Sequence, residues 1–212
     1  MAGTSNYLQN KELDFELRGQ AFSPVATEYV ALFTCTNGAI ARSTAYALNN
    51  TVTVTAADGH QHLYKVTTAG TTAASAPAYP GVSNEVITDG TAVLTEQTAA
   101  LEAGTITEVS GGSYARSSIA SSLTAWSGTQ GAGTTVASSG TTATISNNAA
   151  VSFPTPTANW STLPVQVCGF MTFDALTAGN PLRFGLLTAN QNISTGNTVS
   201  FAAGQLTIVF DK

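Results

Sequence analysis

Short runs in which apolar and polar residues alternate cover much of the chain, and Gly, Asn, Ser and Asp residues separate them. Alternation with a period of two is the pattern of a half-buried β-strand. One run, residues 28–34 (EYVALFT), is almost continuously apolar and predicts a core strand that is buried on both faces. Evenly spaced short strands are typical of a β-sandwich or jelly roll, so we expect a mainly β fold.

Two groups of further strands follow from the same alternation. In the middle of the chain, residues 51–55 and 62–67 predict strands on either side of an Asp-Gly turn. A long loop rich in Ala, Ser and Pro comes next, at residues 67–85. Later strands are expected at residues 114–120, 134–137, 141–146, 150–153, 165–173, 182–187, 198–201 and 205–211. The pattern predicts one sandwich domain that is interrupted by an insert.

A single short helix is expected near the N-terminus. Ser5 or Asn6 can cap its start and Gly19 can end it, which predicts a helix over residues 6–18. Its apolar residues lie on more than one face, and they are Leu8, Leu13, Phe15 and Leu17. Such a helix docks either on its own domain and a neighbour together, or only across the end of its own sandwich.

The chain carries unusually few charges, which changes the expected function more than the expected fold. Charged residues make up 9% of the sequence, against about 25% in ordinary globular proteins. Weak electrostatic repulsion suits a protein that packs against copies of itself or against a larger shell. A Thr-rich secreted domain is the alternative.

Charge and hydropathy also exclude several partners. The net charge is −5 and no Lys or Arg cluster occurs, so nucleic acid is not expected to bind. Residues 1–19 carry acids where a signal peptide has an apolar core, and no apolar run of about 18 residues follows. We expect a protein made in the cytoplasm, without membrane insertion.

No catalytic, cofactor or metal site is expected. The sequence has no Gly-x-Ser-x-Gly motif, and its Gly-rich stretch at residues 127–140 lacks the Lys of a phosphate-binding loop. Asp174 is expected to start a turn, and His60 and His62 lie alone on a polar stretch.

The two cysteines and two tryptophans are assigned structural roles. Cys35 and Cys168 are expected to be buried thiols, with a disulfide between them as the alternative. Trp160 precedes a core strand and is expected to close one end of the sandwich, with its indole N–H bonded to a loop carbonyl. Trp126 lies in a Ser- and Gly-rich loop, where an exposed ring often marks a contact.

Five separated blocks of sequence carry a family resemblance. They are NYLQNKELDFELRGQAF, EYVALFT, TEVSGGSYAR, VSFPTPTANW and VSFAAGQLTIVFD. In this order they resemble a family of small virion proteins of tailed bacteriophages that are usually labelled tail fibre proteins. The resemblance covers roughly residues 4–35 and 105–212. In that family the second block leads almost directly to the third, whereas about 70 residues separate them here, which identifies the middle segment as an insertion.

The inserted segment resembles small modules of phage structural proteins that are distantly similar to chitin-binding modules. It contains STAYALNNTVTV, a TTAGT turn, a PAYP loop and a final Asp-Gly strand. Those modules usually have a Trp after the Asp-Gly turn, where this chain has Leu94. The resemblance implies glycan binding, with Tyr46, Tyr64 and Tyr79 as candidate stacking residues. The residues themselves favour the other role for these tyrosines, as the core of so small a module, because aromatic side chains dominate the cores of small domains.

These observations lead to a domain layout and two competing functions. Residues 1–36 and 104–212 are expected to form the base domain, and residues 37–103 the inserted small β module with its linker. The leading hypothesis is a non-enzymatic virion structural protein that forms a homo-oligomer or binds other virion proteins. It would act as a capsid decoration protein, a tail-tip accessory or a short fibre or adaptor subunit, with the insert projecting outward. Leu8, Phe15 and Trp126 are the candidate interface residues. The alternative is a host-recognition adhesin that binds surface glycans through the insert.

Overall fold

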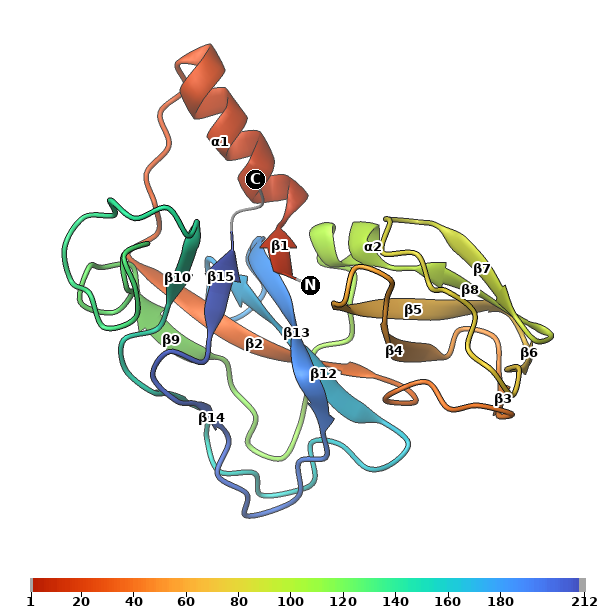
Figure 1. The fold of residues 1–212 in the computed structure, drawn as a ribbon. Coiled ribbons are helices and arrows are strands. Elements are labelled where there is room, and N and C mark those ends of the chain that lie inside the picture. The colour runs from red at the N-terminus through yellow and green to blue at the C-terminus, as the bar shows by residue number, and fades with distance from the viewer. Residues whose placement is uncertain (1, 210–212) are drawn as a thin grey trace.

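The computed structural model describes residues 2–209 and is mainly β, as the alternation predicts (Figure 1). A five-stranded antiparallel sheet forms the centre of the base domain. Its strands, in spatial order, are β1 (Ala2–Thr4), β13 (Pro181–Gln191), β12 (Gln166–Phe173), β2 (Thr27–Cys35) and β9 (Ser117–Ala120). The apolar run of residues 28–34 lies in β2 and is buried on both faces, which confirms that prediction.

A second layer covers one face of this sheet and completes the sandwich. It consists of two short antiparallel pairs, β10 (Thr144–Ser146) with β15 (Thr207–Val209), and β11 (Val151–Ser152) with β14 (Ser200–Phe201). The core between the layers, here the sandwich core, contains Val30 and Leu32 of β2. Trp160 closes one end, and its Nε1–H donates to the Gly112 carbonyl at 2.9 Å, as expected.

The insert, residues 37–103, has a sheet and a core of its own. Its four antiparallel strands, in spatial order, are β4 (Thr51–Thr55), β5 (Gln61–Thr68), β8 (Ala92–Glu96) and β7 (Val86–Asp89). A short pair, β3 (Ala45–Tyr46) with β6 (Gly70–Thr71), lies beside them. Leu94, at the position of the usual Trp, is buried in the core of the insert.

The insert packs against the second face of the base sheet. Leu63 of β5 and Leu101 of a short helix, α2 (Thr98–Glu102), lie in one cluster with apolar side chains of β2, β12 and β13. Asn190 adds a hydrogen bond from its Nδ2 to Thr53 Oγ1 at 2.7 Å. The insert therefore covers the second face of the base sheet.

Several local expectations need correction. Helix α2 was not predicted, although Ala, Leu and Glu favour a helix and Leu101 anchors it by burial. Residues 134–137 form turns and irregular structure rather than a strand, because Gly residues surround them. The expected strand at residues 205–211 is β15, and residues 210–211 lie outside the described part.

The expectation for the two cysteines is confirmed: Cys35 and Cys168 are buried, free thiols on neighbouring strands.

Helix α1 (Asn6–Arg18) has the predicted bounds. The Ser5 hydroxyl accepts a hydrogen bond from the Leu8 N–H at 3.2 Å, and Gly19 ends the helix with a left-handed φ of 65°. The helix starts at the base sheet and extends away from it (Figure 1). Within the described residues, neither helix is long and apolar enough to cross a membrane.

Because the insert and base share one apolar cluster, we expect them to unfold together. Leu63→Ala should lower the free energy of unfolding by about 3 kcal/mol, since it leaves a cavity in that cluster. Leu48→Ala, at an exposed position of the insert, is the matched control and should change it by less than about 0.5 kcal/mol. Urea unfolding, followed by fluorescence and circular dichroism, measures the free energy of unfolding of both variants. Equal, small effects of the two substitutions would contradict the shared cluster.

Candidate functional site

The three candidate glycan-stacking tyrosines form part of the core of the insert. Tyr46, Tyr64 and Tyr79 are at most 5% exposed. The rings of Tyr64 and Tyr79 meet edge to face, with centroids 5.2 Å apart. Because a sugar stacks on an exposed ring face, these three rings do not form a stacking platform in this arrangement. The structure places the three tyrosines in the core of the insert, the role that the sequence favoured.

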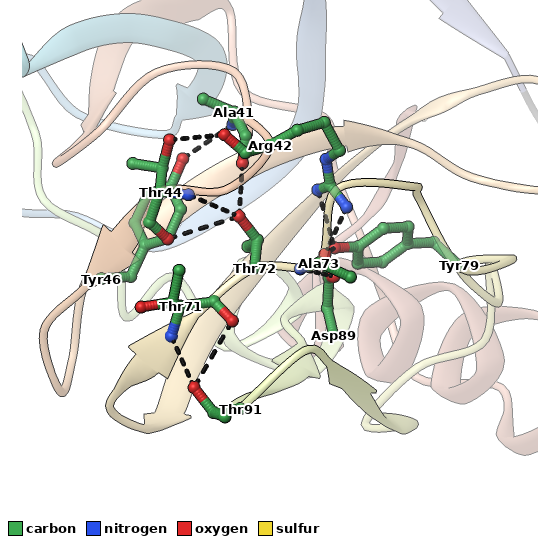
Figure 2. A network of polar contacts seen from close by, with 10 residues as sticks. All are labelled: Ala41, Arg42, Thr44, Tyr46, Thr71, Thr72, Ala73, Tyr79, Asp89 and Thr91. Atoms are coloured by element: carbon green, nitrogen blue, oxygen red, sulfur yellow. Dashed lines mark hydrogen bonds and ion pairs between the residues drawn. The ribbon is translucent and has the colours of Figure 1, made fainter.

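A network around buried Asp89 ties Tyr79 into the insert (Figure 2). The Tyr79 hydroxyl donates to the Asp89 carboxylate, which also accepts from Arg42 Nη1 at 2.6 Å and from the Ala73 N–H at 2.8 Å. Burial alone would raise the pKa of Asp89, but these donors outweigh it and the pKa is lowered. The carboxylate is therefore occupied in holding the loop that carries Ala73 and Tyr79.

The hydroxyls beside Asp89 hold the same loops together. Thr72 Oγ1 donates to the Ala41 carbonyl at 2.7 Å and accepts from the Thr44 N–H at 3.1 Å (Figure 2). The Tyr46 hydroxyl accepts from the Ala41 N–H at 2.8 Å. The network of Figure 2 thus joins backbone segments from opposite ends of the insert, which is a structural role.

His62, which the sequence placed alone on a polar stretch, is buried between two carboxylates. Its Nδ1 lies 3.0 Å from Glu96 Oε1 and its Nε2 lies 2.9 Å from Asp58 Oδ2. The hydrogen bond to Glu96 raises the pKa of His62, burial lowers it and Asp58 raises it, with a net increase. Both ring nitrogens are occupied, so the imidazole has no free nitrogen to act as a base. The missed signal is the alternation that puts His62 on the same face as Tyr64.

A cleft of about 420 Å³ lies beside His62, between the insert and the base. Asp58, His60 and Gly81 line it from the insert, and Phe170 and Leu186 line it from the base. Among residues 2–209, no group of three His, Cys, Asp or Glu side chains is placed to hold a metal ion.

Helix α1 exposes most of its apolar side chains. Leu8, a candidate interface residue, is buried within its own chain and is therefore unavailable for an intersubunit contact. Phe15, the second candidate, is 54% exposed. On the opposite side of the helix, Leu13 and Leu17 are one turn apart and are 55% and 77% exposed. A 13-residue helix is marginal in water on its own, so the outer half of α1 lacks the packing that normally stabilises a helix.

Trp126, the third candidate, lies at a groove near the start of β2. The ring is half-buried against the sandwich core, which corrects the exposed ring that we expected. It lines a groove of about 380 Å³, here called the Trp126 groove. Its apolar lining is Pro24, Leu123, Trp126, Ile145 and Ile208, and its charged lining is Glu28 and Arg183.

Glu28 and Arg183 form an ion pair across the base sheet that is only partly satisfied. Arg183 Nη1 donates to Glu28 Oε1, and both side chains are mostly buried. Thr172 is directly opposite Arg183 in the strand register and shares its face. Within the described residues, Glu28 Oε2, Arg183 Nε and Thr172 Oγ1 are buried without a hydrogen-bond partner. Leaving such atoms unpaired costs free energy, and because they are shielded from solvent, no group outside the chain contacts them in this arrangement.

The pKa shift of His62 predicts a pH-dependent stability. A group whose pKa is raised by folding stabilises the fold fully below its unfolded pKa, about 6.5, and loses this contribution as pH rises through the folded value. The melting temperature of the unmodified protein, relative to that of His62→Gln, should therefore fall over the range that begins at about pH 6.5 and extends upward. Calorimetry of both proteins across this range measures it. A difference that stays constant with pH would contradict the assignment.

Comparison with known proteins gives one family match. Residues 91–209, which run from the last strands of the insert to β15, match the family described as Podophage GP4 fiber I protein gp80. No curated protein matches the sequence.

Proposed function

The chain belongs to the family of podophage GP4 fiber I protein gp80, whose model matches more than half of it, and we propose that it serves as a short fibre or adaptor subunit through assembly contacts. Membership of a phage fibre family makes it a virion structural protein. The match supports a place in the fibre over the capsid decoration and tail-tip roles. It extends to the base domain, the part in which the sequence resemblance also lies.

The observation that carries the assembly role is the exposed outer half of α1. Leu13, Phe15 and Leu17 lie outside the apolar clusters of their own chain, on a helix that extends from the body (Figure 1). Exposed apolar side chains gathered on one element mark an interaction surface more often than scattered ones do. The low charge of the chain supports the same role, because closely packed copies then repel one another weakly.

The proposed role requires no catalysis. His62 is enclosed by Glu96 and Asp58, and the buried Asp89 is occupied by three donors. General acid and base catalysis needs a titratable group within reach of a substrate proton. We accordingly propose that the protein is not an enzyme.

Labelling of phage particles tests this function. Antibodies against the base domain, detected by electron microscopy, should decorate the fibres at the tail, and mass spectrometry should find the protein in purified particles. Antibodies against the major capsid protein are the control for particle integrity. Recovery of the protein only from the soluble lysate would refute a virion role, and labelling of the head would refute the fibre role.

A second candidate function is glycan binding at the cleft between insert and base. The cleft combines polar side chains, Asp58 and His60, with apolar ones, Phe170 and Leu186, which is the mixture that carbohydrate sites use. This is the specific observation in its favour, in place of the three buried tyrosines.

Calorimetric titration with bacterial surface polysaccharides tests the second candidate. Binding should be weakened at least tenfold by His60→Ala, because His60 is exposed at the cleft, while the melting temperature stays unchanged. Gln61→Ala, at the neighbouring position that begins β5, is the control for any effect of a substitution on the strand rather than on the cleft. No heat with any polysaccharide of the panel would contradict glycan binding and leave the fibre role unaffected.

A further inference from the structure

We propose that the outer half of α1 in one copy of the chain binds in the Trp126 groove of a second copy, head to tail. This inference rests on the proposed function and deepens it by identifying the first assembly partner as another copy. The occupant is residues 13–18 of α1, and the site is the groove lined by Leu123, Trp126, Glu28 and Arg183.

The apolar side chains of the outer half of α1 and of the Trp126 groove stay partly exposed to solvent within one chain. Leu13 and Leu17 form a two-residue ridge one helical turn in length, more than half exposed. In the groove, Leu123 is 55% exposed and stands at the side of the half-buried Trp126. A leucine ridge entering a groove beside an aromatic ring is a common way in which helices bind. Burial of both surfaces at once removes them from water.

The polar groups of the two surfaces are complementary as well. The charged lining of the Trp126 groove is one acidic and one basic side chain, Glu28 and Arg183, which pair with each other and are mostly buried. Beside the leucine ridge, α1 carries an exposed ion pair, Arg18 Nη1 to Asp14 Oδ1 at 2.8 Å. In the proposed contact Arg18 lies against the accessible part of Glu28 and Asp14 against that of Arg183, so each charge of the helix meets the opposite charge in the groove.

The outer half of α1 does not line the groove of its own chain; only the inner half, through Lys11 and Glu12, lines a neighbouring pocket with Glu28 and Arg183. The segment of residues 19–26 runs from the end of α1 back to β2 and contributes Pro24 to the edge of the groove. The outer half of α1 points away from the sheets (Figure 1). A second copy can supply the helix without any change of fold.

Symmetric pairing of two α1 helices is a weaker explanation. It would cover Leu13 and Leu17, but it would leave the Trp126 groove open, with Leu123 55% exposed. A head-to-tail contact covers both the leucine ridge and the groove. A pair of copies joined in this way still has one free groove at one end and one free helix at the other. Repeated contacts of this kind form a closed ring when the rotation between copies closes, as expected around a tail.

A complementation experiment with two single variants tests the proposal. Leu17→Asp damages the helix, Leu123→Asp damages the groove, and Leu163→Asp, at another exposed leucine of the base, is the matched control. Each is the full chain, and its melting curve verifies the fold. Light scattering coupled to size exclusion should show oligomers for the unmodified protein and for Leu163→Asp, and monomers for each of the other two.

The decisive sample is an equimolar mixture of the two defective variants. It should form a one-to-one complex, because the intact helix of Leu123→Asp can enter the intact groove of Leu17→Asp. Oligomers of Leu123→Asp alone would show symmetric helix pairing and overturn the proposal. A monomeric unmodified protein, or a mixture that stays monomeric, would also overturn it. Particle labelling tests the fibre role separately, so failure of the head-to-tail contact can be distinguished from failure of the fibre role.

A separate variant tests the charged part of the proposed contact. Arg18→Ala should weaken association by about tenfold, the usual effect of one charged hydrogen bond, while leaving the fold intact. Analytical ultracentrifugation measures the dissociation constant. An unchanged constant would contradict the pairing of Arg18 with Glu28.

Discussion

Burial of both faces of the adjacent strands β2 and β12 is the constraint on which the rest of the structure depends. Side chains that point one way from this pair enter the sandwich core, and those that point the other way enter the cluster shared with the insert. A sheet with two apolar faces needs a cover on each. The C-terminal strand pairs cover one face and the insert covers the other. The insert is thus a structural layer of the base domain, even though it interrupts that domain in sequence.

The two faces also explain where polar groups concentrate. Inside the insert, Asp89 and His62 are surrounded by donors and acceptors, and their networks hold the loops over a small core. Near the start of β2, where Ile145 of β10 and Ile208 of β15 line the Trp126 groove, the Glu28 and Arg183 pair keeps buried atoms without partners. The buried polar groups of the insert thus have their hydrogen-bond partners within the chain, whereas some of those near α1 do not. This difference distinguishes the interior of the insert from the region near α1 that we propose as a contact surface.

Local sequence signals predicted the elements well and their arrangement less well. The caps Ser5 and Gly19 defined α1, and alternation defined the strands of the insert, because both signals depend on neighbouring residues. The apolar residues of β2 predicted its central place. The docking of the insert was not predictable, since Leu63 looks like any strand leucine until its partner face is known. The alternation that places His62 beside Tyr64 was overlooked, whereas its partner Glu96 and the pairing of Glu28 with Arg183 come from strands distant in sequence.

The sheet register sets the order in which parts of the chain can fold. Cys35 in β2 lies opposite Gln166 in β12, 131 residues later, so the central pair of the base sheet forms only after most of the chain is available. The strands of the insert pair with neighbours close in sequence, and short loops close at a lower entropic cost. On a ribosome the insert is therefore expected to mature first. Its exposed Leu63 face then offers a ready surface on which the late-arriving strands of the base can condense.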